Sequence, residues 1–529
     1  MPADHSDVAV LPATFPPASG RRRLALSLAA GVYVASAAWH IFYGAPNTDE
    51  GFYAVATRAV AQGEVPYRDF GFTQPPLSLY VNSVPLRLFG FGLFAQRWVN
   101  GLWGAAALAL AAIWLGRRTR PELGLALAFL FSLSAPWMYF VHLGKTYGLT
   151  ALLVMLAAAV FLALPTGPRR NFLVGLFGGL GVATRLPAAP FFAVLWLATL
   201  WTGRRPALGE VLAACAGPVL GLAVAALPAV LADPANAWFW MVEFHRISVP
   251  NKNWHLAWQE IVTLAPGLWL LAGAGLFAAG PGRRIFGREG AVFFAATAAL
   301  GTNLLQRGVY EEYAVPFLLP LAACSAAWLH DRMAGGRVVR GVALFILVVI
   351  AQFAAAPVIL WPDFPDRRGT PSALLTPNAP RYNSALPDQL AAARQWINRT
   401  LPPGAPFVGT NLILAAETGR AVPAELRMGP FSYTDEMPAD QAARLHFATR
   451  DQLDLWLNDP ATQAVAFFRS WELNYGWSLP SYHATTDEVR QHWLEILRRD
   501  YRVALTEGQF VVLVRRDPAA GPAAAPAKP

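Results

Sequence analysis

An acidic pair beside an apolar stretch is the strongest chemical signal in the sequence. Asp49 and Glu50 directly follow the first long run of apolar residues and precede a segment rich in aromatic side chains. A carboxylate held at such a boundary can act as a general base and accept the proton of an attacking hydroxyl group. Helix capping is the other interpretation, with Thr48 as the N-cap and both acidic side chains in the first turn, where they favour the helix dipole.

Basic residues at the predicted external ends of the apolar stretches form a second set of candidates. Such residues are exceptions to the rule that Lys and Arg stay in cytoplasmic loops, so each requires an explanation. A poorly solvated cation could stabilise the charge that develops on a departing phosphate group. Snorkelling at the interface or a local ion pair would also explain each residue. The candidates for phosphate binding are Lys145, Arg185, Arg246 and Arg307.

Aromatic and polar residues close to these groups in the sequence are expected to line a substrate pocket. They are Tyr53, Arg68, Gln74, Tyr147, His245, Tyr310 and Tyr313. Arg68 has a second interpretation, an ion pair with Asp69 that fixes the loop. Glu243, His245 and His255 have metal-binding side chains, but positions i, i+2 and i+12 match no strong ligand pattern. We therefore assign no metal site and expect that no cofactor is required.

The composition identifies the scaffold that must position these residues. Of the 529 residues, 55% are hydrophobic and only 14% are charged, against about 25% charged in an ordinary soluble domain. This balance excludes a large soluble enzyme and also intrinsic disorder. The two Cys residues, Cys215 and Cys324, fall in apolar stretches, where packing is the expected role.

Eleven apolar segments predict a protein that crosses the membrane many times as α-helices. They cover residues 24–43, 95–115, 122–141, 147–164, 171–184, 187–202, 208–231, 259–280, 289–306, 311–330 and 341–361. Every second loop between them is rich in Arg, so the net charge of +9 reflects membrane topology and not nucleic-acid binding. This alternation predicts a cytoplasmic N-terminal tail over residues 1–23 and a transmembrane region over residues 24–361.

The first segment has an alternative interpretation as a cleaved signal peptide. Ala35-Ser36-Ala37 resembles a cleavage site after a basic and apolar stretch. The apolar run is longer than a usual signal core, and it leads directly into the acidic pair. We therefore expect an uncleaved first span that places the following loop, residues 44–94, on the external face.

Two amphipathic helices are expected in this external loop. Phe52, Tyr53, Ala56 and Val60 fall on one face of the first helix, a pattern suited to a helix that lies in the membrane interface. Pro75-Pro76 begins the second helix.

The chain after the last predicted span indicates a second domain. Residues 362–516 should form a small α/β domain on the external face, opposite the N-terminus, and residues 517–529 a disordered tail. The predicted helices are Asp388–Asn398 and Asp487–Arg499, and the predicted strands are Ala464–Phe468, Tyr501–Leu505 and Phe510–Val514.

Three short strings in the external loop resemble the GT-C glycosyltransferases. The strings are Asp49-Glu50-Gly51-Phe52-Tyr53-Ala54, Pro66-Tyr67-Arg68-Asp69 and Gln74-Pro75-Pro76-Leu77. The resemblance is closest to the branch of lipid A aminoarabinose transferases and protein O-mannosyltransferases. It implies a polytopic membrane fold with an external C-terminal domain. It also implies transfer of a sugar from a polyprenyl phosphate to an acceptor at the outer face of the membrane. The composition, rich in Ala, Arg, Pro and Gly, indicates a bacterium, so we expect this to be the periplasmic face of the inner membrane.

The resemblance also implies functions for single residues. Asp49 would be the catalytic base, and Glu50 would orient it or bind a neighbouring cation. Lys145 matches a position where the family has Arg or Lys at the start of the fourth span. The segment Glu417–Pro423 resembles a turn of the family's external domain and would be structural or help to shape the acceptor cleft. Attack opposite the leaving phosphate would invert the anomeric centre, while the sugar and the acceptor, a lipid, glycan or protein, stay open.

A polytopic transporter or flippase is the alternative function. Transporters place ionisable groups at mid-membrane and often contain paired repeats. In this sequence the charged residues cluster at the ends of the spans and no repeat is visible. A scaffold that merely anchors the C-terminal domain would not need so many spans, so the sequence favours the enzyme.

Overall fold

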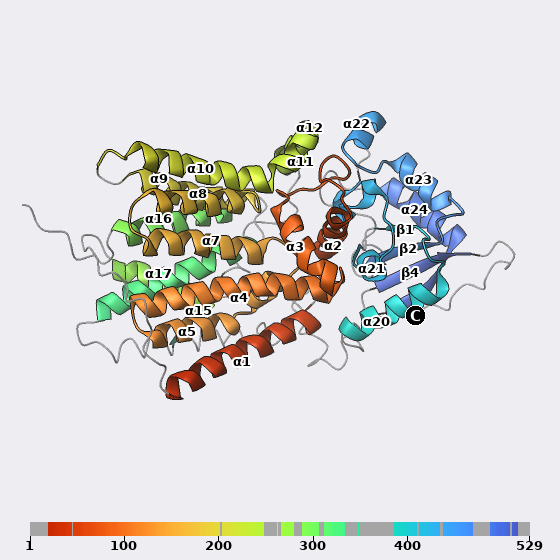
Figure 1. Cartoon of the computed structure of the whole chain (residues 1–529). Coiled ribbons are helices and arrows are strands. Elements are labelled where there is room, and N and C mark those ends of the chain that lie inside the picture. Colours follow the sequence, from red (N-terminus) through yellow and green to blue (C-terminus); the bar gives the residue numbers. More distant parts are fainter. Residues whose placement is uncertain are drawn as a thin grey trace, which may run out of the picture.

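The computed structural model describes most of the chain. The described residues are 20–44, 46–201, 204–247, 262, 266–279, 288–305, 311–333, 347–348, 386–409, 412–433, 437–468, 487–507 and 510–516. A bundle of long helices makes up one end of the molecule, and a unit of helices and a small sheet makes up the other (Figure 1).

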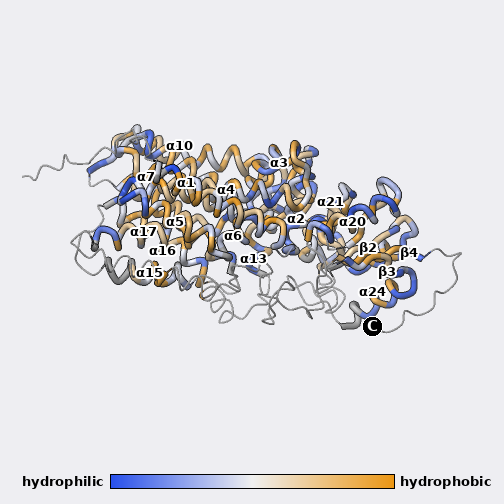
Figure 2. Tube along the Cα trace, turned by 90° about the horizontal axis from the view of Figure 1, so that it is seen from below, coloured by the Kyte–Doolittle hydropathy of each residue, from blue (hydrophilic) through white to orange (hydrophobic). Residues whose placement is uncertain are grey.

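The bundle consists mainly of apolar helices, which Figure 2 shows as predominantly hydrophobic. Its elements are α1 (Gly20–Tyr43), α4 (Leu93–Arg118), α5 (Pro121–Ser132), α6 (Ala135–His142), α7 (Tyr147–Ala163), α8 (Pro168–Val182), η1 (Leu186–Ala188), α9 (Ala189–Leu200), α10 (Leu208–Ala225), α15 (Pro266–Ala279), α16 (Arg288–Gly301), η3 (Thr302–Leu305), η4 (Glu311–Ala314) and α17 (Val315–Met333). Among the described residues, the helices long and apolar enough to cross a membrane are Arg23–Tyr43, Leu93–Arg118, Leu208–Ala225 and Glu312–Asp331.

Helices occupy the described parts of the predicted segments, and the number of membrane crossings stays a prediction. The segment 208–231 is divided into α10 and α11 (Leu227–Ala232). The segment 122–141 is broken into α5 and α6 at Leu133-Ser134, because Pro136 in the first turn of α6 cannot continue a preceding helix. The segments 171–184 and 187–202 form the helices α8 and α9, joined by the short η1 turn. Apart from residues 347–348, the segment 341–361 lies outside the described residues.

Short helices and loops connect the bundle to the second unit. They are α2 (Thr48–Ala61), α3 (Leu77–Phe89), α11 (Leu227–Ala232), α12 (Pro234–Trp238), the π-helical turn η2 (Phe239–Glu243) and α13 (Phe244–Ile247). The loops that join α4 to α5 and α7 to α8 lie at the opposite end of the bundle (Figure 1). The sequence beside these two loops is rich in Arg, and the membrane topology that this position would imply stays a prediction.

A mixed four-stranded sheet forms the centre of the second unit. Its strands β1 (Phe407–Gly409), β2 (Ala464–Phe468), β3 (Tyr501–Glu507) and β4 (Phe510–Arg515) have the order β1-β2-β4-β3. Only β1 and β2 are parallel. The unit also contains α20 (Leu386–Thr400), α21 (Leu412–Thr418), η5 (Ala424–Leu426), η6 (Gly429–Phe431), α22 (Ala439–Arg444), α23 (Arg450–Asn458) and α24 (Asp487–Asp500).

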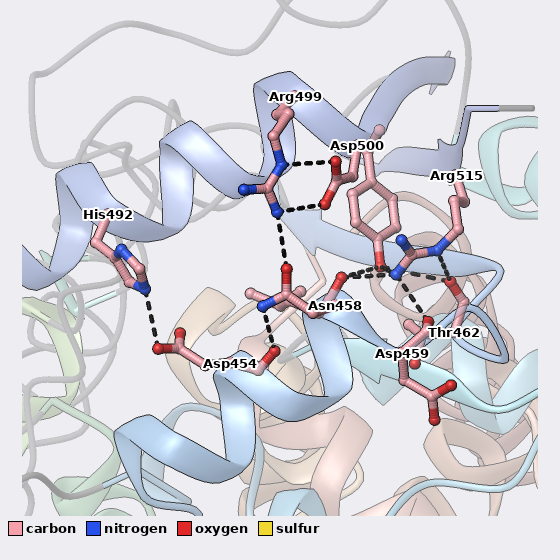
Figure 3. A network of polar contacts seen from close by, with 10 residues as sticks. Asp454, Asn458, Asp459, Thr462, His492, Arg499, Asp500 and Arg515 are labelled. Atoms are coloured by element: carbon pink, nitrogen blue, oxygen red, sulfur yellow. Dashed lines mark hydrogen bonds and ion pairs between the residues drawn. The ribbon is translucent and has the colours of Figure 1, made fainter. Parts of the chain in front are cut away.

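A polar network joins α23, α24 and the sheet on one side of this unit (Figure 3). Asp454 accepts hydrogen bonds from His492 and Trp493, each at 2.9 Å. Arg499 donates to the side chain of Asn458 at 2.8 Å, and Arg515 donates to two carbonyl groups at the end of α23. The network fixes α23 against α24 and the end of β4.

One hydrophobic core includes both α2 and the sheet-containing unit. Phe52 and Val60 of α2 are buried together with Trp240, Ile413 and Phe447. The prediction that α2 lies in the membrane interface is therefore wrong, because its apolar residues pack against protein. On α3, by contrast, Val84, Leu88 and Phe89 are exposed, and its location in the membrane interface stays a prediction.

Candidate active site

The acidic pair lies in the first turn of α2, which is capped by Asn47. The Asn47 side chain accepts a hydrogen bond from the backbone of Asp49 at 3.0 Å. The backbone N–H of Asn47 donates to Glu50 at 2.9 Å, which completes a capping box. Thr48 is thus the first residue of the helix and not its N-cap, contrary to the sequence prediction. The Asp49 carboxylate takes no part in the cap and stays partly exposed, at 24%.

Glu50 forms a fully buried, bidentate ion pair with Arg97 of α4. The guanidinium Nε and Nη2 atoms donate to the two carboxylate oxygens at 2.8 and 2.7 Å, and the side chains are 0% and 1% exposed. Arg97 also donates to the carbonyl groups of Ile41 and Gly44 at 2.9 Å each. Glu50 therefore links α2 to the end of α1 and the start of α4.

Glu50 also reaches the loop between α6 and α7. Its Oε1 atom accepts a hydrogen bond from the backbone of Gly144 at 3.2 Å, the residue before Lys145. A Cβ atom at Gly148, in the first turn of α7, would lie 2.5 Å from the carbonyl oxygen of Asn100. This glycine permits close contact between α7 and α4, so both sides of the loop are fixed.

Lys145 lies between two carboxylates. Its Nζ atom is 2.8 Å from Oδ2 of Asp49 and 3.1 Å from Oε1 of Glu312, and its side chain is only 4% exposed. Burial alone would lower the pKa of Lys145, but the two carboxylates raise it well above its ordinary value. The lysine is therefore a buried ammonium group next to the candidate base.

Arg185 supplies a second buried cation close to Lys145. Its guanidinium lies over the rings of Tyr147 and Tyr313, at 4.4 and 5.0 Å from their centroids, and donates to the hydroxyl of Thr146 at 3.2 Å. Arg185 also lines a small pocket at the junction of η1, α7, α16 and α17. Its lining residues are Thr150, Arg185, Pro187, Ala188, Leu300, Asn303, Tyr313 and Pro316. The lining thus combines one buried cation with several apolar side chains.

Asp49, Lys145, Glu312 and Arg185 are called the charge cluster below. Two further predicted pocket residues lie close to it. Tyr53 stacks on Phe52 and is electrostatically coupled to Asp49, Lys145 and Arg185. His245 is bonded through Nε2 to the carbonyl group of Thr73 at 2.8 Å. Burial lowers the pKa of His245, and Arg185 lowers it further, so the imidazole is neutral at pH 7.

The motif around Tyr67 forms a tightly bonded turn. Tyr67 has a φ of 71°, which is uncommon for a residue other than glycine. Its hydroxyl donates to the carbonyl group of Gln74 at 2.7 Å, and its N–H donates to Phe70 at 2.8 Å. Arg68 and Asp69 pair with each other at 2.8 Å on the surface. The motif therefore shapes the loop, and Arg68 is not part of the charge cluster.

Other predicted residues lie away from the cluster or cannot be placed. Arg246 pairs with Glu243, three residues earlier, and is 72% exposed. Arg307, Tyr310 and His255 lie outside the described residues. Among the residues that the structure describes, no group of three or more His, Cys, Asp or Glu side chains could hold a metal ion.

Arg97 and Glu312 are members of the site that the sequence analysis did not select. Both are ionisable residues within predicted apolar spans, 95–115 and 311–330. Charged residues are rare in such segments and usually have a partner or a function. That signal was present in the sequence.

The fold consists of a helix bundle, a loop carrying an acidic residue at one end and a further unit packed on that end. Two crystal structures of ArnT from Cupriavidus metallidurans superpose on almost the whole chain. The structure bound to undecaprenyl phosphate has a TM-score of 0.58 at 15% sequence identity, and covers 96% of this chain and 100% of that one. The apo structure has a TM-score of 0.59 at 16% identity, with 95% and 99% covered.

Comparisons of the sequence with family models and with curated proteins found no match. At these identities the likeness to ArnT, a lipid A aminoarabinose transferase, shows the fold. This fold agrees with the one that the resemblance in the loop strings implies.

Proposed function

We propose that this protein is an inverting glycosyltransferase that moves a sugar from a polyprenyl phosphate to an acceptor hydroxyl. The observation that carries the proposal is the contact between Asp49 and Lys145, 2.8 Å apart, with Arg185 in the adjoining pocket. One structural neighbour, ArnT from Cupriavidus metallidurans, binds undecaprenyl phosphate. The arrangement combines a carboxylate for the acceptor with cations for the phosphate.

During the reaction a proton moves to the carboxylate on the acceptor side of the site, and a negative charge develops on the phosphate side. The acceptor oxygen forms a bond to the anomeric carbon while the bond from that carbon to the phosphate oxygen breaks. The hydroxyl proton passes to Asp49, which becomes neutral, and the leaving phosphate gains one negative charge. Such base catalysis contributes about 10²–10⁴-fold to the rate.

Lys145 couples these two changes. While Asp49 is charged, it attracts the ammonium group at 2.8 Å. When Asp49 accepts the proton, this attraction weakens, and the ammonium becomes available to the phosphate as that group gains charge. Arg185 adds a cation held by two tyrosine rings. Fixed charges in a poorly solvated site are the most effective way to stabilise a developing anion.

The topology that fits this function places the site outside the cytoplasm. The Arg-rich loops lie at the far end of the bundle, where Arg118 pairs with Asp331 at 2.7 Å. By the positive-inside rule that end faces the cytoplasm. The Asp49 loop and the C-terminal unit then face the periplasm of a bacterial inner membrane.

The test measures sugar transfer by the purified protein with a panel of labelled polyprenyl-phosphate sugars and candidate acceptors. Asp49→Asn should lose about 10²–10⁴-fold in turnover while it keeps its folding and lipid binding. Asp451→Asn is the matched control, because Asp451 is an exposed aspartate in the first turn of α23.

Full activity of Asp49→Asn would refute the assignment of the base. No transfer or hydrolysis with any sugar, together with vectorial movement of a lipid or solute in vesicles, would identify a transporter instead.

A further inference from the structure

Glu312 belongs to the charge cluster but has no part in the transfer step itself. It lies in η4, directly before α17, whereas Asp49 lies on α2. Its Oε1 atom is 3.1 Å from the Nζ atom of Lys145. Two carboxylates from distant parts of the chain thus share the ammonium group of Lys145, whose side chain is 4% exposed.

Glu312 places a negative charge next to the proposed phosphate site. Besides Lys145, it interacts electrostatically with Arg185 and with the hydroxyls of Tyr147 and Tyr313. Lys145 therefore already contacts a second carboxylate, and the charge of that carboxylate also acts on Arg185. The side chain of Glu312 is 13% exposed, so solvent screens it only partly.

We propose that Glu312 is a positioning residue that competes with the lipid phosphate for Lys145 and thereby favours release of the polyprenyl phosphate product. This inference rests on the proposed function, because it concerns the same phosphate site.

The competition acts more strongly on the product than on the donor. The sugar-linked phosphate is a diester with one negative charge, whereas the polyprenyl phosphate that leaves carries up to two. A fixed carboxylate beside the cations repels the second species more. Lys145 then returns to the pair of carboxylates, in which Asp49 has regained its charge by passing its proton to solvent.

A purely structural function of Glu312 would predict something different. The ion pair connects η4 to the loop of Lys145, so its loss could loosen both elements. Loosening would weaken the binding of every ligand, charged or neutral. Competition predicts the opposite sign, and only for ligands that contain a phosphate.

The experiment compares equilibrium binding of undecaprenyl phosphate and undecaprenol to the full-length protein in detergent micelles. Glu312→Gln keeps the shape and an oxygen acceptor for Lys145 but removes the charge. We expect it to bind undecaprenyl phosphate about three- to tenfold more tightly, the size of a partly screened charge interaction. Binding of undecaprenol should not change. Inhibition by added undecaprenyl phosphate in the transfer assay should strengthen by the same factor.

Two further variants complete the design. Glu312→Asp, which withdraws the carboxylate from Lys145, should shift undecaprenyl phosphate binding in the same direction by a smaller factor, and it serves if Glu312→Gln does not fold. Glu289→Gln, at the far end of α16, is the matched control and should bind both lipids as the wild type does.

Unchanged or weaker binding of undecaprenyl phosphate in both Glu312 variants would overturn the proposal. An equal change for undecaprenol would also overturn it, since that result indicates loosening. The binding arm needs no turnover. A wild-type protein without transferase activity would therefore count against the proposed function and leave the charge competition to be judged by binding.

Discussion

The buried pair of Glu50 and Arg97 allows a quantitative prediction about the support of the catalytic base. Glu50→Gln would keep the volume of the side chain but leave the guanidinium of Arg97 without a counter-charge in a site of 0% exposure. Removal of one partner from a buried ion pair costs about 3–5 kcal/mol. The carbonyl groups that also accept from Arg97 would compensate only part of this loss.

The same substitution should reduce catalysis beyond its effect on folding. Glu50 fixes the first turn of α2 and, through Gly144, the loop that contains Lys145. A displacement of about 1 Å in either element can cost about 10²-fold in rate. We therefore expect Glu50→Gln to lower kcat by about two orders of magnitude at temperatures where the variant is still folded.

The assay combines the melting temperature in detergent with kcat for Glu50→Gln, Arg97→Met and the double variant. The double variant should be less destabilised than the sum of the two single changes, because no buried charge is left alone. Glu243→Gln breaks the exposed pair with Arg246 and should leave both properties unchanged. A Glu50→Gln variant as stable and active as the Glu243→Gln control would refute the reasoning.

Two further predictions concern the contact between the C-terminal unit and the catalytic loop. Gly51→Ala should lower both the melting temperature and kcat, because a Cβ atom there would lie 2.6 Å from the backbone nitrogen of Ile413. Gly209→Ala, where the added atom has nothing within 4 Å, is the control, and equal melting temperatures for the two variants would contradict the prediction. Burial raises the pKa of Glu417, although the N–H of Leu93 donates to it. Its stabilising contribution is therefore full below the ordinary glutamate pKa and is lost as the pH rises through the raised value. Glu417→Gln removes this dependence. The melting temperature of the variant minus that of the wild type should therefore increase as the pH rises from 4 to 8. Parallel curves of melting temperature against pH would contradict the prediction.

Features that depend on short stretches of sequence could be predicted well. The apolar segments, the strand Ala464–Phe468 and the pairing of Arg68 with Asp69 follow from local pattern. So does the position of the acidic pair at the start of a helix. In each case neighbouring residues determine the structure, and the three-dimensional context does not change it.

Features that depend on distant contacts could not be predicted in this way. The apolar face of α2 suggested a lipid surface, but its partner is α21, which is more than 300 residues away in the chain. The strand Phe407–Gly409 was missed because only three residues pair, in parallel, with β2. Glu312 on η4, the second carboxylate partner of Lys145, was also missed. No spacing in the sequence relates Glu312 to Asp49, the first partner.

The long sequence separation between α2 and its partner also affects how the protein is made. Arg58 on α2 donates to the carbonyl group of Arg420, 362 residues later. At about 5–20 residues per second, the ribosome needs roughly 18–72 s to synthesise the chain between them. During that time the helix bundle can insert, but the aromatic side of α2 stays uncovered until the segment that packs against it is synthesised. A nascent chain halted before residue 412 would thus have most of its membrane helices but an unfinished catalytic loop, which makes it a ready target for quality-control proteases.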